Sequence, residues 1–508
     1  MRRNVGFAIF SVALTSAISL VVGFIFTPNL AFSAQKIKPG ATCKTLNSRV
    51  IQSNMLYTCV KKGSKLVWNN GVVVKSAAPT AKPTPVPSAT PSSIPSPGMT
   101  PSAPASPTPT MTPTPSPTPT IKTVAYQDPS EATDNVELCK IKEASNSRGM
   151  TGAGFPIWNS LTPNTGTVKW ALIPIEFPDY KGEANFRSRI DDQMKLLTDW
   201  YLTVSEGKFK VEWVLLNRWV TLPRPSTEYS IAQSANLADA ENGAKLFNDA
   251  MNASDPIFDF TNIQTVNFIL PGGQTFVRES SQGFPWDEAV KKYITKEGPI
   301  SSYSIAGTFF DAAGREYWSY WAHEFGHAIG LPHVGASRGS LPPFNPFDLM
   351  GGQDGPSREL SGWLRFYGNW LADSKVYCKD ASKIKNLDIT LVPLSGSDTG
   401  IKLAILPISQ TKAVMIESRR VTKFSCGPKD RNGVLVYTYD AKLGHGDNFL
   451  MPVVPSGRTS EQNRDNRPCI VEPFANPLLY EGDKVTVEGI TIESVFSGNY
   501  DRIRITRP

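Results

Sequence analysis

The stretch His323-Glu324-Phe325-Gly326-His327-Ala328-Ile329-Gly330-Leu331-Pro332-His333 holds three of the four histidines of this 508-residue chain. In an α-helix each residue advances by about 100°, so His323 and His327 point to the same side and can bind one metal ion. Gly330 can take the left-handed conformation that ends a helix, and Pro332 cannot continue one. The chain therefore turns, and His333 can approach the same ion from another direction. This spacing predicts a three-histidine zinc site.

The residues around this stretch favour a helix. Apolar side chains recur at helical spacing on a face distinct from that of His323 and His327. They are Trp318, Trp321, Ala322, Phe325, Ala328 and Ile329. A bare His-Glu-x-x-His pattern also occurs by chance, and a single histidine is often a buried, hydrogen-bonded core residue. The added glycine and third histidine, in a chain with only four histidines, favour metal binding.

The full pattern His-Glu-x-x-His-x-x-Gly-x-x-His resembles the zinc-binding sequence of the metzincin metalloproteases. In those enzymes a methionine in a tight turn lies beneath the metal. By resemblance this residue is Met350, in Phe347-Asp-Leu-Met-Gly-Gly352. Many metzincins carry a tyrosine just after that methionine. Gly352 stands in its place here, so no tyrosine is assigned as a ligand or as a partner of the oxyanion.

The flanking residues are most similar to the secreted bacterial metalloproteases related to immune inhibitor A, the M6 family. Trp170-Ala-Leu-Ile-Pro-Ile-Glu-Phe-Pro-Asp179 resembles the opening strand of that family, and residues 201–211 resemble a helix end and the next strand. Residues 265–272 resemble a further strand. Many relatives have aspartate where this chain has His333. The resemblance spans residues 140–505 and is specific only around the zinc-binding stretch.

The resemblance implies a secreted zinc endopeptidase, a hydrolase that cleaves peptide bonds in proteins or peptides. One catalytic zinc ion would activate water and polarise the carbonyl group. Glu324, beside His323, is the predicted general base and then passes the proton to the leaving amine. This reaction needs no organic cofactor. The alternative is a surface adhesion or scaffold protein with a structural zinc, although such sites are more often closed by a fourth cysteine or histidine.

Composition predicts five parts and export from the cytoplasm. Arg2 and Arg3, an apolar run and the small-residue pattern Ala31-Phe-Ser33 are typical of a signal peptide. The apolar run is long enough to span a bilayer, so a membrane anchor is the alternative. A proline-rich segment favours an extended spacer. The parts are the signal peptide or anchor (1–34), a small β module (35–75), a Pro/Thr/Ser-rich disordered linker (76–121), the metalloprotease domain (122–375) and a β-sandwich-like domain (376–508).

The small β module is predicted to consist of consecutive hairpins. Its strands are expected at 55–60, 65–68 and 72–74, and Asn70-Gly71 suits a type I′ turn. So short a unit needs a covalent link, and Cys43 with Cys59 is the predicted disulfide. Its lysines offer contacts for an anionic cell-envelope polymer, with solvated surface lysines as the commoner alternative. They are Lys36, Lys38, Lys44, Lys61, Lys62 and Lys65.

The even number of cysteines, six, favours disulfides formed outside the cytoplasm. Beyond the predicted Cys43–Cys59 pair, three connectivities are open to the other four. A free Cys139, just ahead of the catalytic domain, would be an inhibitory zinc ligand in a zymogen. The four are Cys139, Cys378, Cys426 and Cys469.

The coarse pattern predicts an α/β (α+β) domain followed by an all-β, sandwich-like domain. The resemblance implies that the first is a metzincin-type catalytic domain with a zinc-binding helix and a Met-turn. After residue 377 helical periodicity gives way to short apolar runs typical of a β-sandwich. The catalytic strands are expected at 168–177, 209–216 and 265–270, and the helices at 186–203, 231–251, 315–329 and 358–371.

The net charge of +7 is modest for this length, and basic residues are interspersed with acidic ones, so no nucleic-acid partner is expected. A calcium ion is a further candidate cofactor, although no loop has the ordered spacing of a calcium site. His445, in the glycine-flanked stretch 443–446, is predicted to be a surface loop residue. The candidate calcium ligands are Asp311, Asp348, Asp354 and Asp447.

Overall fold

The computed structural model describes residues 38–43, 49–52, 55–73, 121–145, 152–157, 162–232, 237–278, 294–308, 316–335, 344–353, 357–425, 432–461 and 474–508. The chain divides into two units, Met1–Pro113 and Thr114–Pro508. The predicted signal peptide and all but the last residue of the predicted linker lie outside the described residues. Among the helices that are described, none combines the length and the apolar character needed to cross a membrane.

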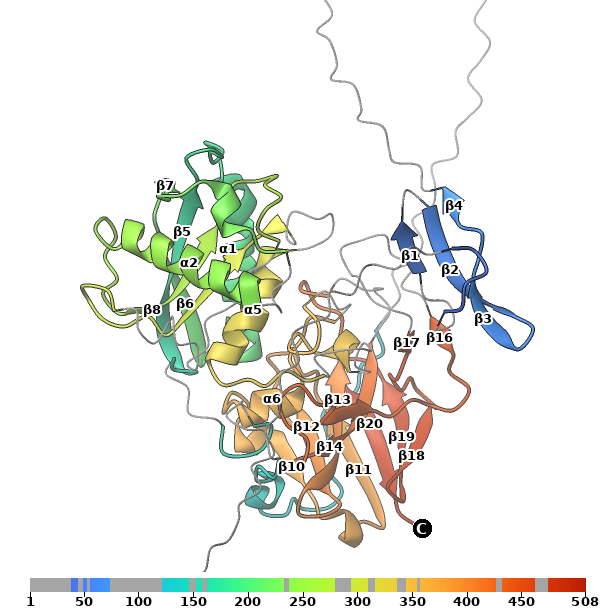
Figure 1. Cartoon of the computed structure of the whole chain (residues 1–508). Helices are drawn as coiled ribbons and strands as arrows, with labels where there is room; N and C mark the ends of the chain where they lie inside the picture. Colours follow the sequence, from blue (N-terminus) through green and yellow to red (C-terminus); the bar gives the residue numbers. More distant parts are fainter. Residues whose placement is uncertain are drawn as a thin grey trace, which may run out of the picture. The chain divides into compact units, whose positions relative to one another are not determined.

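The first unit is a small antiparallel sheet centred on β2 (Met55–Lys62) (Figure 1). The Cys43–Cys59 disulfide is confirmed. The predicted second hairpin is wrong, because the last strand pairs with β2 and not with its predecessor. Gly71 donates to the Asn69 side chain at 3.1 Å and has a φ of 73°, and this turn leads the chain back to β2. The partners of β2 are β1 (Arg49–Gln52), β3 (Lys65–Trp68) and β4 (Val72–Val73).

The second unit begins with a parallel sheet in the order β6-β5-β8-β9, with β7 also paired to β5 (Figure 1). Three of its strands lie close to the predicted ranges, whereas β7 and β9 were not predicted. A mixed α/β architecture is therefore present. The strands are β5 (Gly166–Glu176), β6 (Phe209–Leu215), β7 (Val220–Thr221), β8 (Ile263–Ile269) and β9 (Ser302–Ala306).

Helices cover both faces of this parallel sheet. Trp170 and Leu172 of β5 enter a core that includes side chains of two helices, whereas Ala171 and Ile173 enter a second core on the opposite face. A strand that is buried on both sides needs apolar residues at consecutive positions, which explains the continuous apolar run in β5. The helices of the first core are α1 (Arg187–Val204) and α5 (Tyr317–Ala328), and that of the second is α2 (Leu237–Ser254).

The C-terminal strands form two larger sheets that share one apolar core. In one sheet the order is β10-β12-β13-β14-β15, and in the other it is β11-β20-β19-β18. Leu406, Val414 and Val436 of the first sheet pack with Ile389 and Ile503 of the second. The bounds are β10 (Val376–Cys378), β11 (Asn386–Leu391), β12 (Leu403–Pro407), β13 (Lys412–Arg419), β14 (Gly433–Asp440), β15 (Leu450–Pro452), β18 (Lys484–Val487), β19 (Ile490–Ser497) and β20 (Asp501–Thr506), beside a separate pair β16 (Ser460–Glu461) and β17 (Phe474–Ala475).

The five-stranded sheet also packs against the α/β part of the same unit. Met415 and Tyr437 enter the core that contains α1 and α5, on the opposite face from Val414 and Val436. The short helix α6 (Gly362–Tyr367) belongs to this shared core. It is shorter than the predicted helix at 358–371. This core contains residues from both sides of the predicted domain boundary at residue 375. The division of the chain into two domains at this residue stays a prediction.

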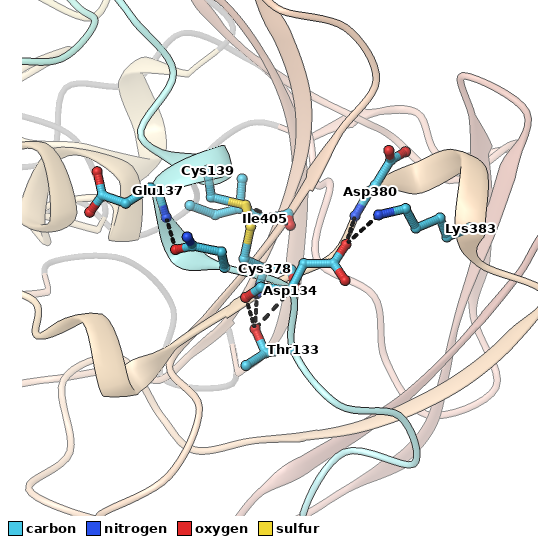
Figure 2. The surroundings of a disulfide bond; sticks show 9 residues. Thr133, Asp134, Glu137, Cys139, Cys378, Asp380, Lys383 and Ile405 are labelled. Atoms are coloured by element: carbon cyan, nitrogen blue, oxygen red, sulfur yellow. Dashed lines mark hydrogen bonds and ion pairs between the residues drawn. A yellow bond between two sulfur atoms is a disulfide. The ribbon is translucent and has the colours of Figure 1, made fainter.

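A second disulfide joins Cys139 to Cys378 on β10 (Figure 2). It is one of the connectivities left open by the sequence, and it shows that the alternative of Cys139 as a zinc ligand is wrong. Thr133 supports the link, since its hydroxyl oxygen accepts the Cys378 N–H at 3.0 Å. Cys426 and Cys469 lie outside the described residues. Disulfides of this kind are typical of extracellular or secreted proteins.

Buried charges connect β13 to the start of α6. The Glu417 carboxylate is fully buried and accepts the Gly362 N–H at 2.7 Å and the Tyr437 hydroxyl at 2.8 Å. Arg419 donates to Glu417 at 2.5 Å and to the Phe347 carbonyl at 2.8 Å. A buried charge is tolerated only when its partners are in place. These contacts therefore fix the turn before Met350 relative to the sheet.

Glu417→Gln is expected to lower the free energy of unfolding by about 3–5 kcal/mol, because it removes the carboxylate that forms an ion pair with the buried Arg419 guanidinium. Asp388→Asn is the matched control, since Asp388 pairs with Arg504 on an exposed surface at 2.9 Å. Exposed ion pairs contribute little. Urea unfolding of the two variants measures both effects, and equal losses would contradict the role assigned to Glu417.

Candidate metal centre

Helix α5 ends where the sequence places its glycine. The backbone of Gly330 has a φ of 98°, in the left-handed region. The Leu331 N–H donates to the Gly326 carbonyl at 2.8 Å, and the Gly330 N–H donates to the His327 carbonyl at 3.0 Å. These two bonds form a Schellman motif, which satisfies carbonyl groups at the end of a helix. The chain then turns back toward the helix.

His323 and His327 lie one turn apart on α5, with ring centroids 4.9 Å apart. The Nδ1 atom of His323 bonds to the Leu349 carbonyl at 2.7 Å, and Nδ1 of His327 bonds to the Leu331 carbonyl at 2.9 Å. A carbonyl only accepts, so Nδ1 carries the proton in both rings and Nε2 carries the lone pair. This is the arrangement that metal-binding histidines use.

The ring of His333 contacts the backbone of Gly335. Its Nδ1 lies 3.0 Å from the Gly335 carbonyl oxygen and 3.3 Å from the Gly335 nitrogen, so these contacts fix the ring and are compatible with either tautomer. Its ring centroid lies 5.1 Å from that of His323 and 5.9 Å from that of His327. The turn after Gly330 thus brings the third predicted ligand beside the first two.

Glu324 completes the most compact group. Within the described part of the chain, only His323, Glu324 and His327 form a histidine, cysteine or carboxylate group whose ligand atoms all lie within 4.8 Å of one another. His333 is not a member of this group, although its ring lies close to both histidines. Three neighbouring neutral imidazoles and an adjacent carboxylate are a donor set that fits a divalent transition metal.

Burial keeps the imidazoles neutral. Burial, together with the nearby His333, lowers the pKa of His323 to about 3. Burial is also the main reason that the pKa of His327 is well below its ordinary value and that the pKa of His333 is lowered. Neutral imidazole is the form that binds metal ions. The cluster is therefore ready for a metal at neutral pH.

Met350 packs directly against the helix. Its side chain is fully buried, and a Cβ atom at Gly326 would lie 2.5 Å from its sulfur. The Val334 N–H donates to the Met350 carbonyl at 3.0 Å, and the Met350 N–H donates to Asp348 at 2.8 Å. The methionine side chain thus fills the space beside Gly326, which has no side chain and directly precedes His327.

Asp348 holds the turn through its carboxylate. One oxygen accepts the Met350 N–H at 2.8 Å and the other accepts the Ser361 N–H at 2.7 Å. Burial raises the pKa of this group to about 6. These bonds give Asp348 a structural role. Calcium binding stays a prediction, with Asp447 accepting the Gly444 N–H at 3.2 Å and with Asp311 and Asp354 outside the described residues.

His445 also belongs to the cluster, so its predicted place as a surface loop residue is wrong. Its Nδ1 accepts the backbone N–H of His333 at 3.1 Å, and its ring centroid lies 5.1 Å from that of His327. The Gly446 N–H donates to the His333 carbonyl at 3.1 Å. All four histidines of the chain thus gather in one place, and the scarcity of histidine was the only sign of this in the sequence.

Comparisons with known proteins do not place the chain in a family. No protein-family model and no curated protein matches it. Metalloproteinase-II from Bacteroides fragilis is similar with 16% identity and a TM-score of 0.24, over 44% of this chain and 58% of that protein. OgpA from Akkermansia muciniphila is similar with 10% identity and a TM-score of 0.25, over 59% of this chain and 95% of OgpA. These TM-scores are too low to support a conclusion about this chain.

Gly326→Ala is expected to weaken metal retention and to lower the free energy of unfolding by about 1–3 kcal/mol, because the added methyl group overlaps Met350. The control is the same substitution in a Met350→Ala background, where the sulfur is absent and the added loss should be smaller. Urea unfolding and metal analysis measure both effects. An equal loss in the two backgrounds would contradict the contact.

The metal-free protein is expected to lose stability as the pH falls below 6.5. The pKa of His323 is about 3 in the folded chain and 6.5 in the unfolded chain, so the unfolded state takes up the proton first. The stability that each buried neutral histidine contributes is complete above pH 6.5. Below pH 6.5 the free energy of unfolding falls by about 1.4 kcal/mol per pH unit for each such histidine, until the pH reaches its pKa in the folded chain. Urea unfolding of chelator-treated protein measures it. A His323→Gln/His327→Gln variant should show a smaller decline, and an identical decline would contradict the assignment.

Proposed function

We propose that this chain is a zinc endopeptidase of the metzincin type that acts outside the cytoplasm. One observation supports this most directly. His323 and His327 each donate Nδ1–H to a backbone carbonyl, the ring of His333 lies beside theirs, and Glu324 follows His323 on α5. The resemblance to the M6 family stays part of the proposal and rests on the sequence. Met350 would be the methionine of the Met-turn.

The three histidines would hold the zinc ion through their Nε2 atoms. When bound, zinc would supply Lewis acidity to water and to the peptide carbonyl. The carbonyls of Leu349 and Leu331 would keep the rings of His323 and His327 in their orientation and in the correct tautomer. The backbone of Gly335 would hold the ring of His333 in place. Metal binding would need no large movement of these side chains, because the three rings already lie side by side.

Glu324 would act as the general base and then as the general acid. It would take a proton from the attacking water and pass it to the nitrogen of the leaving amine. Glu324 is only 9% exposed, and little bulk water competes for the proton. This carboxylate, the zinc site and water would together supply the nucleophile and both proton transfers.

The alternative function is a surface adhesion or scaffold protein with a structural zinc. It would require a fourth protein ligand, and His445 is the only additional histidine in the chain. Its Nδ1 accepts a backbone N–H, so the neutral ring carries its proton on Nε2 and has no lone pair for a metal. This favours an open, catalytic site over a closed one.

The remaining parts of the chain suit work outside the cell. We propose proteins or peptides as substrates, and export through the N-terminal segment. In the first unit, Lys61, Lys62 and Lys65 are exposed and would be the contacts for an anionic envelope polymer. The disulfides of both units agree with an oxidising environment.

Glu324→Gln is expected to keep one zinc ion per chain and to lower kcat for casein by about 10²- to 10⁴-fold, because the amide cannot accept the proton. Asp191→Asn, on the exposed side of α1, is the control and should cleave casein like the wild type. Metal analysis and a casein assay with and without chelator measure the outcome. A zinc-loaded Glu324→Gln protein with full activity would refute the mechanism.

A further inference from the structure

Peptide hydrolysis needs a donor for the carbonyl oxygen, and the expected tyrosine is missing. As water attacks the carbonyl carbon, the electron pair of the C=O bond moves onto oxygen, and a fixed N–H or O–H group stabilises that charge. Many metzincins carry a tyrosine where this chain has Gly352. A side-chain donor to this oxygen would therefore come from elsewhere in the fold.

His445 comes from the connection between β14 and β15, far along the sequence from the zinc-binding stretch. The connection is held by bonds of its own: the Gly444 N–H donates to Asp447 at 3.2 Å, and the Asp447 N–H donates to the Gly444 carbonyl at 3.0 Å. Two further bonds tie it to His333, one through the His445 ring and one through the Gly446 N–H. His445 is thus placed by backbone groups on both sides.

The hydrogen bond to His333 determines the tautomer of His445. A backbone N–H can only donate, so Nδ1 of His445 accepts and the neutral ring holds its proton on Nε2. His323 and His327 have the opposite tautomer, with Nδ1–H donating to carbonyls. The cluster therefore contains rings whose Nε2 lone pair suits a metal and one ring suited to donate a hydrogen bond.

We propose that His445 is a catalytic residue that donates its Nε2–H to the carbonyl oxygen of the substrate, an inference that rests on the proposed function. The proton stays on His445 throughout. The oxygen of water forms a bond to the carbonyl carbon, and the oxyanion accepts the Nε2–H. The C–N bond then breaks, the electron pair returns to the carbonyl, and Glu324 protonates the leaving amine.

Two substitutions of His445 separate the roles of its two ring nitrogens. His445→Asn places an amide oxygen where Nδ1 lies, so it keeps the acceptor for the His333 N–H and removes the donor. His445→Gln places an amide nitrogen near the position of Nε2, so it keeps a donor and removes the acceptor. Each variant is the matched control of the other, and thermal unfolding checks that both are folded.

The test combines zinc content with the kinetics of a peptide that the wild type cleaves in a mixed peptide library. For His445→Asn we expect one zinc ion per chain, an unchanged KM and a kcat lowered about 10²- to 10³-fold, the effect of losing one oxyanion donor. Calorimetry should show an equal loss of affinity for a phosphinic analogue of that peptide. His445→Gln should keep more of the wild-type kcat than His445→Asn.

The outcomes are distinct. A folded His445→Asn protein with the wild-type kcat overturns the inference and leaves the proposed function in place. Loss of zinc from His445→Asn also overturns it, because His445 would then act only through the metal ligand. A zinc-loaded wild-type chain that cleaves no peptide in the library overturns the proposed function, and this inference with it.

Discussion

Three backbone carbonyls orient the predicted metal ligands, and the rest of the site depends on them. The carbonyl groups of Leu331, Gly335 and Leu349 all lie in the segment that follows helix α5. A helix alone can place two imidazoles on one side, but it cannot choose their tautomer. The path of the chain after Gly330 is therefore as important for the site as the helix that carries the histidines.

That path is held by charges buried between the α/β part and the five-stranded sheet. Asp348 accepts two backbone N–H groups around Met350, and Arg419 reaches the carbonyl of Phe347 from β13. Glu417 neutralises Arg419 and binds the first N–H of α6. Each charge is costly to bury alone, so the network favours one arrangement of these segments. The sheet thus acts as part of the scaffold of the histidine cluster.

The sequence predicted the local features well and the long-range ones poorly. Apolar periodicity located β5, α1 and α5, and the spacing of His323, His327 and His333 was informative because one helix and one turn contain all three. Strand β9 carries Ser302 and Ser304 and so lacks a clear apolar pattern. The helix predicted at 358–371 stops early, where Asn369 has a φ of 61°. His445 reaches the site by a contact across 112 residues, which no local pattern encodes.

The position of His445 has a consequence for the timing of activity. A chain is made from its N-terminus, and His333 emerges 112 residues before His445, the residue whose ring accepts its N–H. The catalytic centre that we propose would thus be completed late in synthesis, once the connection after β14 has been made.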